Sequence, residues 1–144
     1  MRHRSTTQKG AALIESAIVL LTFLVILFGI MEAGRLMNVQ ETLTDAAREG
    51  ARFAVAPMTQ TSTHPSVAEI QAVVDVFLHS TGINGATTTV QQAITPFPPL
   101  PGGYQTTYTR VRVDYQYQPL IGKMFFPGTL SLKGEALMRN ETSP

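Results

Sequence analysis

The sequence predicts an α+β protein in which one long helix, membrane-spanning in its first half, packs on a small antiparallel sheet. Residues 11–31 are apolar except for Glu15, residues 32–56 continue with helical periodicity, and two later segments alternate apolar and polar side chains. An apolar helix of about 20 residues can cross a bilayer. Strict alternation is typical of a half-buried antiparallel strand. About three strands and one extra helix are expected beyond the long helix.

The composition disfavours several classes of function. The chain has 144 residues, a formal net charge of +1 and no cysteine, so it lacks the basic surface typical of a nucleic-acid binder and any thiolate site. His3, His64 and His79 are scattered and lack the spacing of metal ligands. The sequence also contains no phosphate-binding glycine motif. A hydrolase built from Ser66, His64 and Asp75 is a remote alternative, because no nucleophile elbow is present. We therefore expect no enzyme activity, cofactor, metal, nucleic-acid partner or small-molecule substrate.

The charges around the apolar run predict its orientation. Arg2, Arg4 and Lys9 precede it, and residues 1–10 contain no acid. Lys and Arg remain on the cytoplasmic side, which predicts a single pass through a membrane with residues 57–144 outside the cytoplasm. A cleaved secretory signal peptide is the alternative. Its apolar stretch normally has only about 7–15 residues, and no small-x-small cleavage site follows the run here.

Residues 32–56 are predicted to form the amphipathic outer part of the same helix, which ends before Pro57. With the span, the helix would comprise about 45 residues, or roughly 68 Å. Side chains three or four residues apart lie on one helical face. The apolar face comprises Leu36, Val39, Leu43, Ala46, Gly50 and Phe53. The expected ion pairs on the helix surface are Glu32–Arg35, Asp45–Arg48 and Glu49–Arg52.

A second helix is predicted after a polar linker. Ser66 precedes an apolar-periodic run and is followed three residues later by Glu69, the pattern of a capping box. Gly82 is expected to close this helix. Ser66 is therefore interpreted as a helix cap.

Three strands are expected after this helix. The first lies between Gly85 and Pro96, and the others lie within residues 106–120 and 129–140. The Pro- and Gly-rich segments 96–103 and 122–128 are expected to be irregular, with no role indicated, and Phe125 and Phe126 are either buried or contact a partner. The inward residues are expected to be Val111, Val113, Tyr115 and Tyr117 on one strand, and Leu130, Leu132, Ala136 and Met138 on another. We expect the core to unite Val111, Val113, Leu130, Leu132, Phe77 and Leu43.

A family resemblance rests on the first half of the chain. A short basic leader ends at Gly10, and an apolar helix follows with Glu15 at its fifth position when Ala11 is counted as the first. This is the class III signal of type IV pilins and pseudopilins. The stretch "GAALIESAIVLLTFLVILFGIMEAGRLMNVQETLTDAAREGARFAV" resembles the TadE-like proteins, pseudopilins of the tight-adherence (Tad, or Flp) pilus, with "AAREGAR" as its most specific part. Ser16 stands where Tad pilins often have Tyr or Phe, and "ALMRNE" near the C-terminus resembles the end of that family's domain.

The resemblance implies a non-enzymatic pseudopilin, or minor pilin, in Tad pilus assembly and secretion. It implies cleavage after Gly10 by a prepilin peptidase, which leaves residues 1–10 as a leader, residues 11–56 as the long helix and residues 57–144 as a small extracytoplasmic domain. Other pilins and Tad machinery subunits would be the partners, in a homo- or hetero-oligomer. The alternative is an unprocessed single-span assembly factor that acts as an interaction module. Entry into a filament, or only the priming of one, is left open.

Glu15 is costly at membrane depth and therefore needs a reason. Cleavage after Gly10 would create an amine on Ala11, one helical turn from Glu15, and the helix dipole also favours an anion there. The carboxylate would pair with this amine or with that of a neighbouring subunit, which offsets the desolvation of both charges. The alternative is that Glu15 only reaches to the cytoplasmic headgroups.

A second candidate site lies in "AAREGAR". Arg48, Glu49 and Arg52 form a charged cluster beside Gly50 and neighbouring alanines. Small residues allow another backbone to approach closely, which favours docking of the sheet or of another subunit. A solvated helix face explains the charges equally well.

Overall fold

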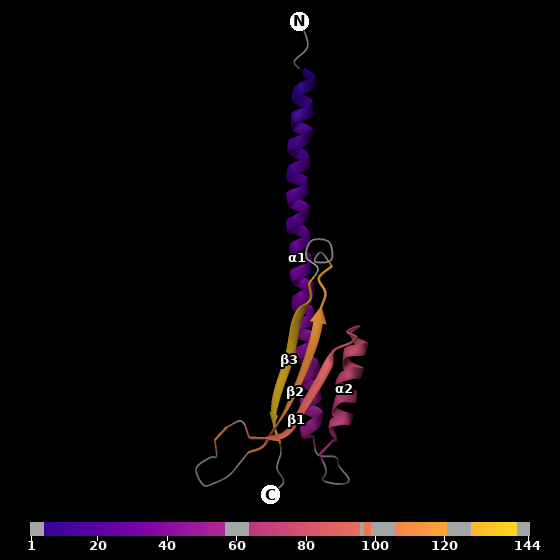
Figure 1. Ribbon diagram of the computed structural model, residues 1–144, viewed down its shortest axis with the longest axis vertical. Coiled ribbons are helices and arrows are strands. Elements are labelled where there is room, and N and C mark those ends of the chain that lie inside the picture. The colour runs from indigo at the N-terminus through magenta and orange to yellow at the C-terminus, as the bar shows by residue number, and fades with distance from the viewer. Residues whose placement is uncertain (1–4, 57–63, 96, 99–105, 121–127, 141–144) are drawn as a thin grey trace.

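The computed structural model describes residues 5–56, 64–95, 97–98, 106–120 and 128–140, and the side chains among them from residue 10 onward. It confirms the α+β prediction, with a long N-terminal helix, a second helix and a three-stranded antiparallel sheet. Figure 1 shows the first helix as a rod whose N-terminal part projects alone and whose C-terminal part lies along the sheet. The elements are α1 (Ser5–Val55), α2 (Val67–Ser80), β1 (Thr87–Ile94), β2 (Tyr108–Tyr117) and β3 (Leu130–Arg139).

Helix α1 is continuous over 51 residues. It begins before Ala11, so the Gly10–Ala11 bond lies inside the helix, and it ends at Val55, shortly before Pro57. A straight α-helix of this length measures roughly 77 Å at 1.5 Å per residue. The three predicted ion pairs on its surface are present, with N–O distances of 3.7 Å for Glu32–Arg35, 3.2 Å for Asp45–Arg48 and 2.7 Å for Glu49–Arg52.

Helix α2 begins and ends with the predicted capping groups. The backbone N–H of Glu69 donates to the Ser66 hydroxyl, and the backbone N–H of Ser66 donates to the Glu69 carboxylate at 2.8 Å, which completes the capping box. The C-cap is Thr81, and Gly82 follows it with a φ of +80°. The N–H of Ile83 then donates to the Leu78 carbonyl at 2.9 Å, in the pattern of a Schellman motif.

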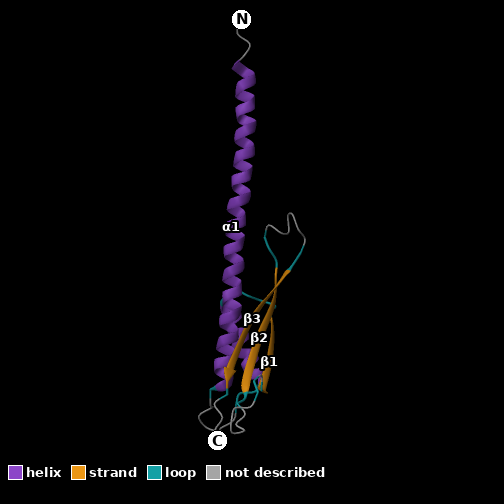
Figure 2. Cartoon of the chain, turned by 90° about the vertical axis from the view of Figure 1, so that its left-hand side faces the viewer, coloured by secondary structure: helices purple, strands orange, loops and turns teal. Residues whose placement is uncertain are grey.

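The sheet has the order β1-β2-β3 and covers one side of the outer part of α1 (Figure 2). Strand β1 pairs with β2 from Thr87 opposite Asp114 to Ile94 opposite Tyr108. Beyond Asp114, β2 pairs only with β3, as far as Tyr117 opposite Leu130. Strands β2 and β3 therefore extend past β1 at the end of the sheet that faces the projecting part of α1 (Figure 1).

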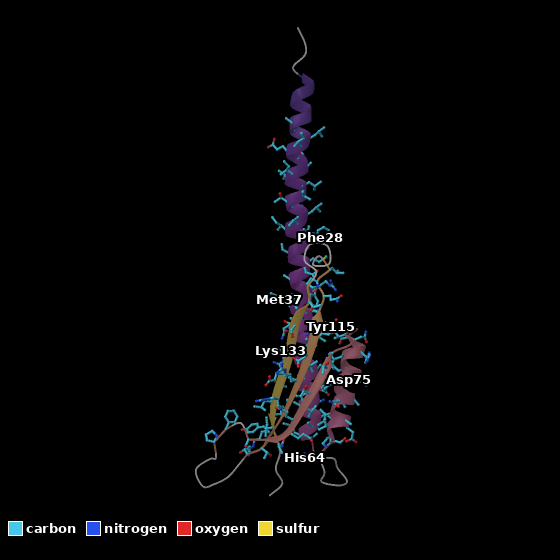
Figure 3. The ribbon with its side chains drawn as sticks, viewed as in Figure 1. Phe28, Met37, His64, Asp75, Tyr115 and Lys133 are labelled. Carbon is cyan, nitrogen blue, oxygen red and sulfur yellow. The ribbon has the colours of Figure 1, made fainter. Side chains whose placement is uncertain are left out.

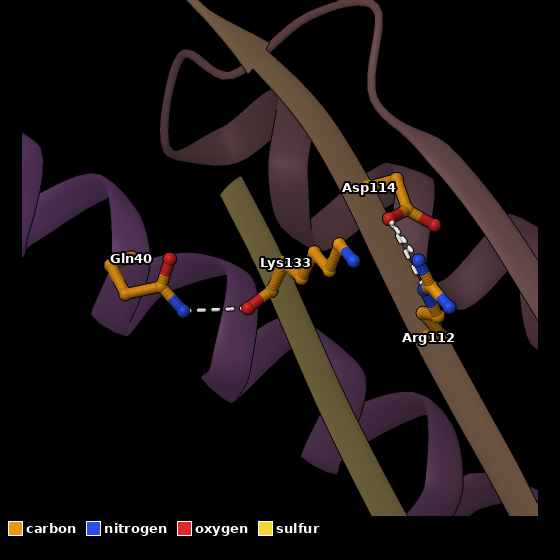
Figure 4. A network of polar contacts seen from close by, with 4 residues as sticks. All are labelled: Gln40, Arg112, Asp114 and Lys133. Atoms are coloured by element: carbon orange, nitrogen blue, oxygen red, sulfur yellow. Dashed lines mark hydrogen bonds and ion pairs between the residues drawn. The ribbon is translucent and has the colours of Figure 1, made fainter. Parts of the chain in front are cut away.

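The two edge strands are modified in different ways. The register of β1 shifts between Gln91 and Ile94, where Ala93 has a φ of +54°, and the Gln71 side chain of α2 donates to the Thr88 carbonyl at 2.9 Å. On β3, the Gln40 side chain of α1 donates to the Lys133 carbonyl at 2.6 Å (Figure 4). Both helices therefore bind backbone groups of the edge strands.

The core lies between α1, α2 and the inner face of the sheet. Val111 and Val113 of β2 are fully buried, as is Leu43 of α1, which confirms the predicted alternation and the predicted helical face. Gly134 of β3 faces the helix, and a Cβ at this position would collide with the Leu43 carbonyl. The other buried apolar residues include Ala46, Ala47, Ala51, Ala54, Ile70, Val74, Leu78, Ile83 and Ala136.

The prediction for Leu130 was wrong. Its side chain is 46 % exposed, whereas Phe77 and Leu132 are partly buried against the core. Leu130 is the first residue of an edge strand and pairs with Tyr117 beyond the end of β1. Alternation identifies the face of a sheet but not where the covering elements end.

Some predictions lie outside the described residues. These concern Phe125 and Phe126, most of segments 96–103 and 122–128, and the start of the basic leader.

Candidate functional site

The N-terminal half of α1 is apolar and uncovered. Among the described residues, α1 is the one helix long and apolar enough to cross a membrane, with an 18-residue window of mean hydropathy 2.6 and none of that window buried. Large apolar side chains point outward all around it, such as Leu13, Phe23 and Ile30, each more than half exposed. A helix that is apolar on every face belongs in a protein core or in a membrane. No core surrounds it here, so a single-pass membrane anchor is consistent with this half.

Glu15 lies on this uncovered half. Its side chain is exposed, and it shares a shallow groove with Ser16, Val19 and Phe23. The Ser16 hydroxyl donates to the Ala12 carbonyl one turn earlier, at 2.8 Å. Serine in a helix can satisfy its hydroxyl in this way, so Ser16 remains compatible with an apolar surrounding.

The other predicted processing residues, Gly10 and Ala11, precede Glu15 on the same uncovered half of α1. Gly10 and Ala11 are both exposed, and a Cβ added to Gly10 would have no atom within 4 Å. The bond between them is therefore sterically accessible but helical.

The "AAREGAR" segment is divided between two faces of α1. Ala46, Ala47 and Ala51 are fully buried in the core. Gly50 is buried beside Val74 and Val111. A Cβ at Gly50 would collide with the Val74 side chain of α2. The small residues therefore allow the close approach of this chain's own helix and sheet.

The charged residues of the segment lie on the opposite, solvated face. The side chains of Arg48 and Arg52 are 65 % and 71 % exposed and pair with Asp45 and Glu49 of the same helix. The hydrogen bond from Arg52 to Glu49 lowers the pKa of Glu49 and raises the pKa of Arg52. Exposed pairs of this kind contribute little to the stability of a helix. The sheet therefore packs against the strip of small residues, and the charged residues lie outside that strip.

The structure also brings together a polar cluster that the sequence did not indicate. Glu32 lies one residue beyond the apolar run, and its Oε1 accepts hydrogen bonds from the Tyr117 hydroxyl at 2.5 Å and from the Leu120 N–H at 3.3 Å. Its Oε2 lies 3.7 Å from Nη1 of Arg35, and the Glu32 side chain is only 15 % exposed. Burial, and then the hydrogen bond to Glu32, raises the pKa of Tyr117. We call this cluster of Glu32, Arg35, Tyr117 and Leu120 the junction cluster.

No local signal could have revealed the junction cluster. Glu32 and Tyr117 are 85 residues apart, and Glu32 also suits the predicted pair with Arg35. The one hint was that Tyr117 ends the inward row of its strand, where a buried hydroxyl needs a partner.

The outer face of the sheet is polar. Nε and Nη2 of Arg112 donate to Oδ1 of Asp114 at 3.1 and 2.9 Å (Figure 4), and Arg110 lies 3.1 Å from Glu135 of β3. The pairing with Asp114 raises the pKa of Arg112. These charges neutralise one another within the sheet.

The "ALMRNE" segment contributes a buried polar pair. The Thr109 hydroxyl donates to Oδ1 of Asn140 at 2.8 Å, and the Asn140 N–H donates to the Thr107 carbonyl at 2.9 Å. Thr109 and Asn140 are both almost fully buried. Asn140 therefore joins the end of β3 to the start of β2.

Within the described ranges, no group of three or more His, Asp or Glu side chains could hold a metal ion. His64, which precedes α2, and His79, in the last turn of α2, are both exposed. Ser66 is committed to the capping box, with its hydroxyl 2.7 Å from Glu69.

Comparisons with known proteins bear on α1. The comparisons with curated proteins and with solved structures find no match. Residues 10–52 match the family model described as TadE-like protein. The matched segment begins at Gly10, includes Glu15 and ends at Arg52, so it covers the apolar half of α1, the junction with the sheet and "AAREGAR". It does not reach "ALMRNE". The predicted resemblance to the TadE-like proteins, a family associated with the Tad pilus, is thereby confirmed over residues 10–52.

Proposed function

We propose that this protein is a pseudopilin, or minor pilin, of Tad pilus assembly and has no enzymatic role. Residues 11–31 cross the inner membrane with the N-terminus in the cytoplasm, and residues 57–144 form a small domain on the other side. A prepilin peptidase removes residues 1–10, and the mature chain then packs with other pilins and Tad machinery subunits. One observation carries the proposal, namely the family match that begins at Gly10 and includes Glu15.

The uncovered surface of α1 supports a role in packing. The helix presents apolar side chains on every side of its first half, and only lipid or other apolar helices can cover such a surface. The outer half is already packed on its own sheet. We therefore assign the contacts with other pilins to the first half, and also to the charges of Arg48, Glu49 and Arg52 that face away from the core.

Cleavage after Gly10 is tested by N-terminal sequencing of the chain purified from membranes that contain the Tad prepilin peptidase. The mature protein should begin at Ala11. Gly10→Val should block cleavage, because the added side chain hinders the scissile bond. Gly29→Val is the matched control, since Gly29 is another α1 glycine with no atom within 4 Å of an added Cβ. An intact leader in the wild-type chain beside an active peptidase would refute the processing step.

The role of Glu15 is tested by counting pili on cells that carry only Glu15→Gln. The variant should insert and be trimmed normally, because a neutral side chain costs less in lipid. It should nevertheless fail to support pili, because a partner amine left unpaired in a buried setting costs about 3–5 kcal/mol. Glu41→Gln, at an exposed acid of the same helix, should leave piliation unchanged. Normal piliation with Glu15→Gln would mean that Glu15 only reaches to the headgroups.

A second candidate is an anchored assembly factor that retains its leader. It is favoured by the continuity of α1 through the Gly10–Ala11 bond, since a peptidase must unwind this turn first. Sequencing decides between the two. A chain that starts at Met1 and still supports pili would favour the retained leader.

A further inference from the structure

The position of Glu32 relates the small domain to the bilayer. The apolar run comprises residues 11–31, which measure roughly 32 Å as an α-helix. This length matches the hydrocarbon core of about 30 Å. Glu32 is the next residue, so in a chain that spans the bilayer its carboxylate lies at the outer boundary of the hydrocarbon. This step rests on the span assumed in the proposed function.

The junction cluster holds one end of the sheet at the same level. The Tyr117 hydroxyl and the Leu120 N–H both donate to Oε1 of Glu32, at 2.5 and 3.3 Å. Tyr117 is the last residue of β2 and is only 3 % exposed. In Figure 3, Phe28 lies on the part of α1 beyond the strands, and Met37 lies near the level at which β3 begins. The end of the sheet therefore adjoins the end of the span.

Among the described residues of the sheet and its connections, two large apolar side chains are exposed at this end. Leu120 is 57 % exposed, and Leu130, directly opposite Tyr117, is 46 % exposed. Leucines in these positions would be costly in water but favourable at a bilayer surface, where apolar groups are buried about 5–10 Å into the headgroup region. Tyrosine is also enriched at this depth in membrane proteins.

We propose that this end of the sheet rests on the outer surface of the bilayer, with Leu120 and Leu130 inserted between the lipid headgroups. The occupant is lipid, because the surface continues directly from a helix that is itself surrounded by lipid. The contact holds the sheet upright at the membrane and shields the Glu32 carboxylate from the hydrocarbon with the Tyr117 hydroxyl and Arg35. A second copy of the chain is the competing occupant.

The experiment uses single cysteines, because the chain has none of its own. Leu120→Cys and Leu130→Cys are labelled with an environment-sensitive fluorophore in the full chain, at one copy per phosphatidylcholine–phosphatidylglycerol nanodisc. Lipids with a spin label near the headgroup serve as quenchers for the labels on the sheet, and lipids with a spin label on the acyl chain serve as quenchers for a label within the span. Leu137→Cys is the matched control, since Leu137 is 37 % exposed on the same strand and lies seven residues, or roughly 24 Å, farther from the junction. Phe23→Cys reports insertion of the span.

The labels at positions 120 and 130 should lose much of their emission to the headgroup quencher, because they lie at the depth of the spin label, and the label at position 137 should lose almost none. Glu32→Gln combined with Tyr117→Phe should reduce quenching at position 120 and leave position 23 unchanged, because only the junction cluster is broken.

The alternatives give distinct results. Without quenching at position 23 the span itself fails, and the proposed function fails with it. Quenching at position 23 but not at positions 120 and 130 overturns this inference alone. Equal quenching at position 137 also overturns it, because the domain would then lie flat on the membrane. If the labels at positions 120 and 130 report an apolar environment only when several copies share a nanodisc, the surface is covered by a second copy. That result overturns the inference too.

Discussion

The two halves of α1 belong to one uninterrupted helix but have opposite surroundings. In residues 11–31 the large apolar side chains are exposed on every face, whereas residues 36–54 bury one face against α2 and the sheet. The difference follows from the distribution of apolar residues, which is all-round in the first half and one-sided in the second. The outer half is stabilised by its own chain, and the first half requires an apolar environment from outside.

The comparison separates two sources of stability. Unfolding of the small domain should depend on the outer half of α1 and be almost independent of the first half. Substitutions that are alike in chemistry but lie in different halves should therefore have different effects. The following predictions apply to the purified full chain in detergent micelles, with unfolding by urea followed through tyrosine fluorescence, since the chain contains four tyrosines and no tryptophan.

The largest effect is expected for Leu43→Ala. Leu43 is fully buried in the core, and Leu→Ala in a core lowers the free energy of unfolding by about 2–5 kcal/mol. Leu24→Ala, in the half without protein neighbours, should leave the urea transition of the domain unchanged. A shift of the same size in both variants would mean that the two halves unfold as one unit.

A smaller loss is expected for Gly134→Ala. The added Cβ would collide with the backbone carbonyl of Leu43, and a backbone cannot rotate away as a side chain can. The strand and the helix must separate, which should cost about 2–3 kcal/mol, the upper part of the range for overpacking. Gly128→Ala is the matched control, because a Cβ there meets nothing within 4 Å. Equal stability of the two variants would show that the helix is not held against β3 as described.

The smallest effect concerns the boundary between the two halves. Near pH 8, Tyr117→Phe should lower the free energy of unfolding by about 1.5 kcal/mol, because a hydrogen bond to a charged group is lost. The pKa of Tyr117 is raised in the folded chain. Its contribution is therefore complete below the unfolded pKa of about 10 and is lost as the pH rises through the higher folded value.

The stability difference between wild type and Tyr117→Phe should accordingly narrow above pH 10. Urea transitions of both proteins at several alkaline pH values measure it. A difference that stays constant with pH would contradict the role given to the junction cluster.

Local patterns were sufficient to predict the elements of the fold. The alternation around Val111 and Val113 identified the inner face of β2, and Ser66 with Glu69 identified the start of α2, because both signals act over a few residues. The limits of the core were not predictable in this way. Leu130 continues the inward row of β3, but its exposure depends on where β1 and α1 lie, which no local pattern contains.

For the candidate site, the sequence drew attention to the acid at Glu15 within an apolar run and to the small residues around Gly50. It did not decide whether those small residues face the chain's own sheet or another subunit, because both require a close approach of backbones. Gly134 could have been recognised, since a glycine at an inward position of a strand often marks such an approach. The contact of Glu32 with Tyr117 depends on the completed fold.

The side chains that bind the two edge strands bear on how neighbouring copies of the chain would associate in the membrane plane. If the chain is anchored as proposed, copies would meet side by side at high local concentration, where exposed strand edges would join into continuous sheets. Gln40 and Gln71 bind edge carbonyls of Lys133 and Thr88, and the irregular backbone at Ala93 interrupts the other strand's ladder. Lateral association of such copies would therefore be steered away from strand pairing and toward contacts between helices, which can be made and reversed without unfolding the domain.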